Sequence, residues 1–462
     1  MYRIKNWVIQ WKWNVLSAGL FLLLWEILSF MLGNDYLFPS VRTVFSYMLD
    51  LAQTSDFYRH LFITLFRAAE CLMLSFILAL PVSYLLCKSR VAEKLLAPFL
   101  YFMKTTPVIA FLLLALIWLS SEQVPLFIAF VGMLPILVIN ITSGFRSIEK
   151  GHMEMASVYK LSVFRKFIYM EYPVLKTFLI AGISGALGLG WRAIIIGEAL
   201  ASVPYGLGAA MKQAQNYVDV PWLFAITLVS LLASYALEML VKSLLHVKLH
   251  RLFPVKRRSV FKRSKSVQTN NKVLSVEELS FRRKQNRIFE GFNMHISKGE
   301  IVLLTGVSGV GKSTLIDIIA GIEKDFGGTV TCGDISVLFQ QSRLCPWLTI
   351  REHIDLYLPV EVSEDQVREL SKVMQIDHLT DKYSPELSGG EIQRINLMLT
   401  LLYPADLYML DEPLTGIGEE HKIYLLEWIR NYMKQNGATV LWISHDPEHK
   451  RISDRIVELE DI

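Results

Sequence analysis

Long apolar runs alternate with short polar intervals in the first half of the chain, up to about His246. A helix that crosses a bilayer needs about 20 apolar residues, since it rises ~1.5 Å per residue. Six runs come close to this length, and they are residues 15–32, 67–87, 95–119, 125–142, 174–197 and 222–241. The pattern predicts a helical domain with six membrane spans, which places both of its ends on the same side of the membrane.

The charges of the polar intervals predict which side that is. Lys and Arg near the ends of spans stay in the cytoplasm. Twenty of them lie in the chain start, the two alternate intervals and the segment after the last span, whereas the other three intervals hold only Arg42, Arg59 and Lys212. We therefore expect a multi-pass protein of the cytoplasmic (inner) membrane, with its N-terminus and its second half in the cytoplasm.

The second half has the mixed apolar and charged pattern of a soluble α/β domain, and 462 residues are too many for one ordinary domain. We predict a transmembrane domain over residues 1–250, a basic linker over 251–271 and an α/β domain over 272–462. The linker contains KRRSVFKRSKS, which begins at Lys256. We expect it to be solvated and to lie near anionic lipid headgroups, and we expect no nucleic-acid role because no aromatic platform accompanies it. The four cysteines have no paired spacing, so neither a disulfide framework nor a zinc site is expected.

A phosphate-binding loop opens the α/β domain. The strand-like run EIVLLT is followed by GVSGVGKST and then by an apolar helix start. This order is the strand-to-helix context that a Gly-x-x-x-x-Gly-Lys-Ser loop requires. Its backbone N–H groups surround phosphate, Lys312 reaches the β- and γ-phosphates, and Ser313 offers a hydroxyl to Mg²⁺. The predicted nucleotide-binding residues here are Gly306, Val307, Ser308, Gly309, Val310, Gly311, Lys312, Ser313 and Thr314.

A second apolar strand, DLYMLDEP, ends in two carboxylates. Asp411 is expected to hold Mg²⁺ and Glu412 to polarise the attacking water. Carboxylates after a strand also cap helices, and that alternative weakens once a phosphate loop lies upstream, because the two strands are then expected to be neighbours in one sheet.

Three further stretches complete the predicted site. FQQ supplies Gln340, whose side chain can reach the metal or the water, and TVLWISHD ends with His445 placed to contact the γ-phosphate. LSGGE offers Leu387, Ser388, Gly389, Gly390 and Glu391 at the expected start of a helix, a second anion-binding surface. Taken alone, a histidine after a strand is more often structural, and LSGG is compatible with a simple turn.

Along the chain the five stretches follow one another as GVSGVGKST, FQQ, LSGGE, DLYMLDEP and TVLWISHD. In this order they resemble the ATP-binding cassette of ABC transporters, and the resemblance extends from about Lys272 to the C-terminus. The resemblance implies a P-loop ABC ATPase with ATP and Mg²⁺, and two cassettes that enclose two nucleotides, with LSGGE of one completing the site of the other. The chain departs from the family at Gly418, where an Asp is usual. The adenine-stacking aromatic is also displaced, since Arg283 occupies its expected position and Phe281 lies nearby.

The polar interval EMASVYKLSVFRKFIYMEYP, residues 154–173, resembles the Glu-Ala-Ala loop with which permeases of binding-protein-dependent importers dock on a cassette. Glu154, Ala156 and Pro173 match the loop, while Lys160 stands at its usual Gly. Met155, Val158, Tyr159 and Val163 can form one apolar helix face for such a contact. An amphipathic helix lying on lipid is the alternative.

Residues 38–246 further resemble permeases of the nitrate, sulfonate and taurine branch. Within them Arg192 and Glu198 are costly near hydrocarbon, by roughly 2.5–3.5 kcal/mol each at the bilayer centre. They either line a path for an anionic or polar solute, or Glu198 lies at the outer interface and Arg192 packs or reaches to the surface.

The combined resemblance implies an ATP-driven importer of a small polar or anionic solute. One chain would supply half of it, so that a second copy completes a homodimer and an external solute-binding protein delivers the solute. The alternatives are an exporter half-transporter and a non-transporting membrane ATPase with a regulatory role.

Overall fold

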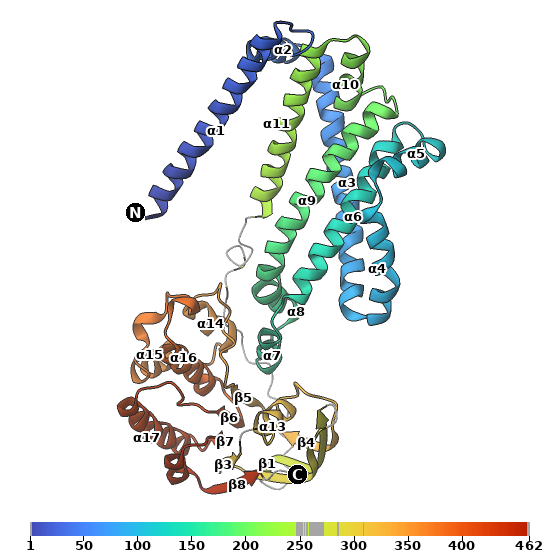
Figure 1. Ribbon diagram of the computed structural model, residues 1–462. Helices are drawn as coiled ribbons and strands as arrows, with labels where there is room; N and C mark the ends of the chain where they lie inside the picture. Colours follow the sequence, from blue (N-terminus) through green and yellow to red (C-terminus); the bar gives the residue numbers. More distant parts are fainter. Residues whose placement is uncertain are drawn as a thin grey trace. The chain divides into compact units, whose positions relative to one another are not determined.

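A computed structural model describes residues 2–245, 253, 255, 257, 272–283, 286–307 and 309–459, without the side chains of residues 2–12, 14 and 420. The chain divides into two compact units (Figure 1). The first unit comprises Met1–Ser147 and Val174–Val247, and the second comprises Ile148–Pro173 and Lys248–Ile462. The polar interval between the fourth and fifth predicted spans therefore belongs to the same compact unit as the α/β domain.

The first unit is helical. Its described part holds five helices long and apolar enough to cross a membrane, or six if one bent pair counts as a single span. Its helices are α1 (Tyr2–Leu32), α2 (Val41–Leu51), α3 (Ser55–Lys88), α4 (Arg90–Thr105), α5 (Val108–Trp118), α6 (Gln123–Arg146), α9 (Tyr172–Leu200), α10 (Leu207–Asn216) and α11 (Val220–Leu245).

Helices α3 and α6 form the densest contact of the first unit. Ala68, Cys71 and Ala79 of α3 are almost completely buried, and Ser83 donates a hydrogen bond to the carbonyl of Val138 at 3.1 Å. Small side chains let two helix backbones approach closely in a membrane, where hydrophobic burial alone does not hold helices together. Large apolar side chains such as Leu23, which is 56% exposed, instead point outward toward the position of lipid.

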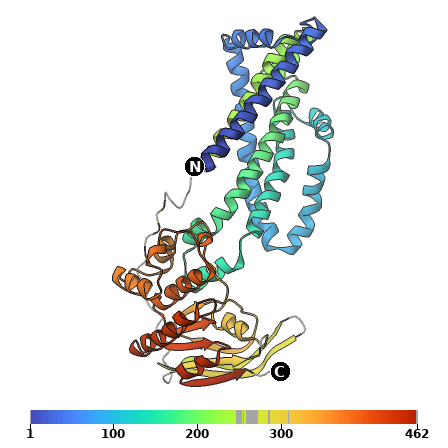
Figure 2. The same cartoon turned by 60° about the vertical axis from the view of Figure 1, so that its left-hand side comes forward.

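The third predicted span, residues 95–119, is not one straight helix. It consists of α4 and α5, which meet at an angle of 95°, and Figures 1 and 2 both show α5 turned away from α4. Pro107 at the break has no N–H for a helical hydrogen bond, and it favours an extended residue before it. Thr106 is extended, with φ −67° and ψ 129°.

Two short helices in the polar intervals, α2 and α10, were not predicted. Helix α2 begins at Ser40, whose hydroxyl accepts a hydrogen bond from the N–H of Thr43 at 3.1 Å. Such a cap satisfies one of the free N–H groups at a helix start. Figure 1 shows α2 and α10 at the same end of the first unit.

The described residues of the second unit form two sheets. Strands β1 (Lys272–Arg283), β2 (Asn286–Ser297) and β4 (Gly327–Cys332) form an antiparallel sheet in the order β2-β1-β4. The other sheet is parallel, in the order β5-β6-β7-β3-β8, and its strands are β3 (Ile301–Gly306), β5 (Ile335–Leu338), β6 (Leu407–Asp411), β7 (Thr439–Ile443) and β8 (Arg455–Leu459). Strand β7 is buried at every position, as expected for a strand covered on both faces.

Helices cover these sheets. They are α13 (Lys312–Ile319), α14 (Ile350–Tyr357), α15 (Glu364–Val373), α16 (Gly389–Leu402) and α17 (Glu419–Gln435), with 3₁₀ turns at Asp377–Leu379, Ser384–Glu386 and Pro447–Ile452. The inserted interval adds α7 (Lys150–Val158), α8 (Val163–Lys166) and the π-helical turn η1 (Phe167–Glu171). The predicted fold class is confirmed: a helical domain with several apolar spans precedes an α/β ATPase fold.

Candidate nucleotide site and coupling surface

The carboxyl ends of four neighbouring parallel strands bring the sequence motifs together. Strand β5 leads to Gln340, β6 ends at Asp411, β7 leads to His445, and β3 leads into the phosphate loop. Ligands of open parallel sheets bind at this edge. In the sheet β7 lies between β6 and β3, so the motifs that follow β5, β6, β7 and β3 lie side by side along this edge.

The phosphate loop has the backbone geometry that its glycines allow. Gly311, the cap of α13, has φ 110°, and a Cβ there would lie 2.4 Å from Cγ2 of Ile288. Lys312 is buried, and its Nζ donates to the carbonyls of Gly306 and Val307, both at 2.8 Å. Burial lowers the pKa of Lys312, while Glu412 and Asp411 raise it. The lysine is thus a desolvated cation beside two carboxylates, held by loop carbonyls. Ser308 lies outside the described residues.

Ser313 and Asp411 meet where a divalent cation is expected. The hydroxyl of Ser313 donates to Oδ2 of Asp411 at 3.2 Å. Burial raises the pKa of Asp411, and the hydrogen bond from Ser313 opposes this. A hydroxyl and a carboxylate are the hard oxygen donors that Mg²⁺ takes together with phosphate oxygens, so this donor set fits the ion.

Glu412 has a strained backbone, with φ 48°. Such conformations cost about 1–3 kcal/mol and cluster at functional sites. The Glu412 carboxylate accepts hydrogen bonds from the N–H of His445 at 3.1 Å and from the hydroxyl of Ser444 at 3.4 Å. The predicted catalytic carboxylate and the predicted γ-phosphate contact are therefore neighbours. Gln340, beyond β5, is exposed.

The sequence motifs did not point to Gln393, which holds the backbone that carries this carboxylate. Its side-chain amide donates to the carbonyls of Glu412 and Pro413, both at 3.1 Å. Gln393 is buried on α16, two residues after LSGGE, and this position was the only hint in the sequence.

The LSGGE stretch starts α16. Ser388 caps the helix, and Oε2 of Glu391 accepts a hydrogen bond from the N–H of Ser388 at 2.7 Å. Helix α16 packs on β5, α14 and α15, whereas the phosphate-loop helix α13 packs on β3 and β4. The two predicted anion-binding surfaces, the phosphate loop and LSGGE, therefore lie on different elements of the unit. A Cβ on Gly390 would lie 2.8 Å from the carbonyl of Gly416, which accounts for one of the two glycines.

The structure shows the surroundings of the positions at which the chain departs from the resembled family. Phe281 is buried, only 7% exposed, and Arg283 is exposed at the end of β1. Phe281 therefore packs in the core and is not free to stack on adenine. Gly418 has φ −60° and begins α17 without a side-chain cap.

The inserted interval 148–173 packs into the core of the α/β unit, and we call its contact area the coupling surface. Tyr159 is 4% exposed and lies between Tyr357 and Tyr403, with ring centroids at 4.6 and 4.9 Å. Met155 and Val158 belong to the same buried cluster. The expected apolar face is wrong at Val163, which is 85% exposed, because α7 ends at Val158.

Two ion pairs flank this apolar contact. Glu154 pairs with Arg343 at 2.6 Å, and the Arg343 guanidinium stacks on Phe339 at 3.4 Å. Lys160 pairs with Asp334 at 2.5 Å, and this contact raises the pKa of Lys160. Arg343 and Asp334 flank β5, so the coupling surface and Gln340 share one short stretch of chain.

Lys160 adopts the conformation that explains the usual glycine. Its φ is 48°, in the left-handed region that ends α7, and Leu161 donates to the carbonyl of Ala156 at 2.8 Å. Glycine adopts this conformation without strain. Pro173 lies at the other end of the interval, as the second residue of α9, directly after η1.

The two charged residues singled out in the fifth span differ in environment. Arg192 is exposed within the unit. Glu198 is completely buried and pairs with Arg67 at 2.8 Å, and it also accepts hydrogen bonds from Thr64 and from the N–H of Gly208. A buried charge is tolerated when it is paired in this way. Glu198 therefore joins α3 to α10.

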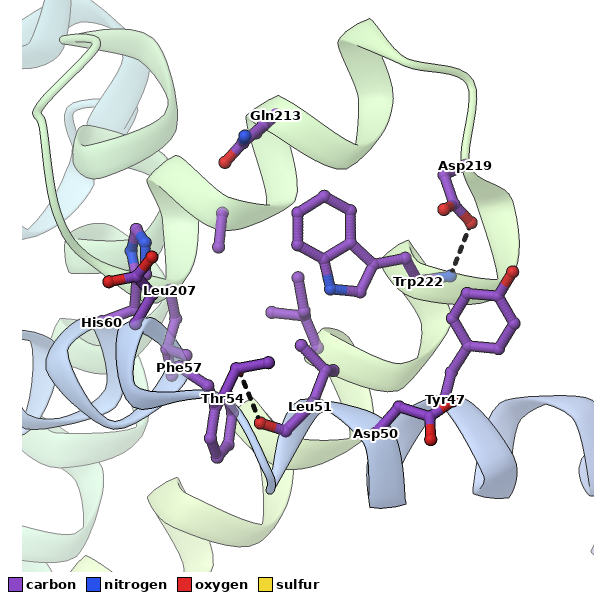
Figure 3. A pocket seen from close by; sticks show the side chains of 13 residues that line it. Tyr47, Asp50, Leu51, Thr54, Phe57, His60, Leu207, Gln213, Asp219 and Trp222 are labelled. Atoms are coloured by element: carbon purple, nitrogen blue, oxygen red, sulfur yellow. Dashed lines mark hydrogen bonds between the residues drawn. The ribbon is translucent and has the colours of Figure 1, made fainter.

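A cavity of about 560 Å³ lies between α2, α3, α10 and α11 (Figure 3). Trp222 and Tyr47 line it together with three carboxylates, Asp50, Asp56 and Asp219. Two of these serve helix starts, since Asp56 lies in the first turn of α3 and Asp219 accepts from the N–H of Trp222 at 3.1 Å. A lining of carboxylates disfavours an anion at this place.

Comparison with known proteins agrees with this architecture. A sequence profile of the family described as "ABC transporter" matches residues 289–415. A profile described as "Binding-protein-dependent transport system inner membrane component" matches residues 72–251. The second match covers most of the helical unit and the whole interval that contacts the α/β fold.

Individual relatives match the α/β half. The aliphatic sulfonates import ATP-binding protein SsuB of Bacillus cereus is 34% identical over 183 residues, which cover 37% of this chain and 73% of that protein. The sulfoquinovosyl glycerol transport ATP-binding protein SmoE of Agrobacterium fabrum is 33% identical over 191 residues, covering 37% of this chain and 53% of that protein. Among solved structures, the dimeric bacterial ABC transporter cassette MJ0796 is 22% identical with a TM-score of 0.37, over 40% of this chain and 94% of that one.

The fold and the site define a membrane ATPase with a nucleotide-binding cassette. This chain belongs to the ABC transporter family, and it joins an import-type permease domain to a cassette that couples ATP hydrolysis to transport.

Proposed function

We propose that the chain is one half of an ATP-driven importer of a small polar or anionic solute across the cytoplasmic membrane. The observation that carries the proposal is the coupling surface, where a permease interval is buried in the core of the ATPase unit. Neither an exporter nor a non-transporting regulator requires the matched family's permease.

The residues at the sheet edge have distinct roles in this proposal. Lys312 and the N–H groups of the phosphate loop bind ATP, and Ser313, Asp411 and Gln340 hold Mg²⁺, which supplies positive charge to the phosphates. Glu412 orients and polarises the attacking water, while His445 holds the γ-phosphate.

A second copy of the chain completes the transporter. Ser388 to Glu391 start a helix away from the phosphate loop of their own cassette, so they are available to the nucleotide of another. A homodimer is the simplest closed arrangement that uses both surfaces twice. We expect a permease domain at 1–250, a linker at 251–271 and a cassette at 272–462.

The surroundings of the transporter follow from the charge pattern. The excess of Lys and Arg on one side supports a cytoplasmic N-terminus and cassette, with lipid around the spans. An external solute-binding protein would then deliver the solute at the end of the permease that carries α2 and α10. The relatives with sulfonate import in their names match only the α/β half of this chain, so they do not decide between a polar and an anionic solute.

Reconstitution tests the proposal. The full-length chain is placed in vesicles with its cassette outward and ATP outside, and the candidate binding protein with radiolabelled solute is enclosed. The expected result is solute export from the lumen that requires both ATP and the binding protein, which corresponds to import in the cell. Glu412→Gln protein is the matched control. ATP turnover without any flux would favour the regulatory alternative, and flux without a binding protein would contradict the importer.

A further inference from the structure

The linker after the last span contacts both the coupling surface and the cassette. Phe253 packs edge-on against Phe164 at 5.6 Å between ring centroids, and its carbonyl accepts a hydrogen bond from the hydroxyl of Tyr169 at 2.6 Å. Phe164 and Tyr169 belong to the permease interval 148–173. Val255, two residues later, packs against the buried cluster of the cassette.

Arg257 then anchors the linker on the helices of the cassette. Its Nε donates to Asp355 at 3.0 Å, one terminal nitrogen donates to the carbonyl of Val362 at 2.7 Å, and the other pairs with Glu364 at 2.8 Å. The Arg257 side chain is 11% exposed, so the expectation of a solvated linker is wrong for this residue. Arginine loses little freedom per hydrogen bond when its planar group meets several acceptors at once.

These contacts bear on a choice that a fused dimer must make. In a pair of identical chains, the interval 148–173 of one permease can dock on the cassette of its own chain or on the cassette of the partner. In the linker, Phe253 contacts the interval 148–173, while Arg257 contacts α14 and the start of α15. Among the described residues, the interval 148–173, the linker and the cassette of a single chain are thus joined by direct contacts.

We propose that each permease domain is coupled to the cassette of its own chain, and that Phe253, Val255 and Arg257 fasten this pairing. The proposal rests on the proposed homodimer, because only a dimer offers two cassettes. Lys160 supports it as a contact specific to this chain, since it pairs with Asp334 of the cassette from the position where the resembled loop has glycine. The two copies of the chain then meet at the nucleotides enclosed between their cassettes.

Site-directed cross-linking tests the proposal on the full-length protein in nanodiscs. The exposed cysteines are first removed as Cys87→Ser and Cys332→Ser, while the buried Cys71 and Cys345 stay. Lys160→Cys and Asp334→Cys are then introduced together, and a short bis-maleimide joins them. The expected product consumes both new thiols and migrates as a single chain on a denaturing gel, with the linked peptides identified by mass spectrometry. A product of twice the mass, or no cross-link at all, would overturn cis coupling.

Two controls separate the parts of the proposal. Each single-cysteine variant gives the background of linkage between copies, and retained basal ATP hydrolysis shows that the cassette is folded. Arg257→Gln is expected to slow the single-chain cross-link several-fold, with Arg368→Gln, whose side chain is 75% exposed, as the matched surface control. An unchanged rate in Arg257→Gln would overturn the role of the linker. The mass of the untreated protein is measured independently, and a monomer would contradict the homodimer of the proposed function while leaving the single-chain contact in place.

Discussion

The nucleotide-binding edge and the coupling surface meet around the same strand, β5, yet they are built in opposite ways. At the edge, backbone groups and charged side chains surround a space, and Lys312 is held by loop carbonyls. At the coupling surface, apolar and aromatic side chains such as Tyr159 fill the space apart from a void of about 10 Å³, and two ion pairs lie at its margins. The edge is prepared to bind a polar ligand, whereas the coupling surface is prepared to transmit displacement without deforming.

This difference predicts two kinds of failure. Removing a polar group from the edge should stop chemistry and leave the fold intact, because that group is used when ATP reacts. Removing volume from the coupling surface should leave chemistry intact and disconnect it from transport, because close packing transmits force through contact.

The largest expected effect is on catalysis by Glu412→Gln. The amide keeps the shape of the side chain but cannot take up a proton, so ATP hydrolysis should fall by about 10²–10⁴-fold while ATP binding persists. Steady-state phosphate release and nucleotide binding are measured on the same preparation. Glu427→Gln, an exposed carboxylate of α17, is the control and should hydrolyse ATP normally. Full activity in Glu412→Gln would remove Glu412 from the catalytic role.

Tyr159→Ala should break the other side of the comparison. Truncating a buried aromatic side chain costs about 3–5 kcal/mol, here at the contact with Tyr357 and Tyr403. Basal ATP hydrolysis should persist, while the number of solute molecules moved per ATP falls severely. Tyr159→Phe is the matched control, since it keeps the ring and its stacking. An unchanged ratio in Tyr159→Ala would show that the coupling surface does not carry the force.

The sequence predicted the edge better than the coupling surface, and the reason is physical. A phosphate loop needs glycines at fixed positions because its backbone conformations exclude other residues, so Gly306 to Lys312 leave a readable pattern. The core of the coupling surface needs only volume and shape, which many residues supply. Val163 was therefore placed on the wrong face, and Tyr357, Tyr403 and Arg343 were not foreseen.

The membrane half shows the same division. Hydrophobic length alone predicted the spans, and it does not reveal the bend at Pro107 that splits the third one. The partner of Glu198 could not be read from the sequence, because Arg67 lies 131 positions away and is recognised only by its burial beside the carboxylate.

Lowering the pH should destabilise the fold beneath the coupling surface, because His353 is buried there. Its Nε2 accepts from the N–H of Cys345 at 2.9 Å, Tyr357 and His152 are the titratable groups beside it, and burial lowers its pKa from 6.5 to about 4. Above pH 6.5 the His353 imidazole is neutral in both the folded and the unfolded state, so its burial costs no protonation energy and the stability is at its full value. As the pH falls from 6.5 toward 4, only the unfolded state takes up the proton, and stability should fall by about 3 kcal/mol.

Thermal unfolding of the full-length protein between pH 7 and pH 4 measures this loss. His353→Gln offers an oxygen to the same N–H and does not titrate, so its melting temperature should vary less over that interval than the parent's. His378→Gln, at an exposed histidine, is the matched control for the substitution itself. Equal slopes for His353→Gln and the parent would show that the buried imidazole is not the group responsible.

The smallest effect is expected at Lys160, where backbone strain and an ion pair oppose each other. A left-handed conformation costs a residue with a side chain about 1–2 kcal/mol relative to glycine. An ion pair as exposed as that with Asp334 contributes about 0.2–1 kcal/mol. Lys160→Gly should therefore be as stable as the parent or slightly more stable, whereas Lys160→Ala keeps the strain, loses the pair and should be less stable than Lys160→Gly by about 1 kcal/mol. Denaturant unfolding of the parent and of both variants, each with and without Asp334→Ala, separates the terms. The pair accounts for the part of the difference between the parent and Lys160→Ala that vanishes in the Asp334→Ala background, and the strain accounts for the difference between Lys160→Gly and Lys160→Ala, which persists in both backgrounds. If Lys160→Gly and Lys160→Ala were equally stable, the turn that ends α7 would not require the left-handed conformation, and the usual glycine of the resembled loop would need another explanation than backbone geometry.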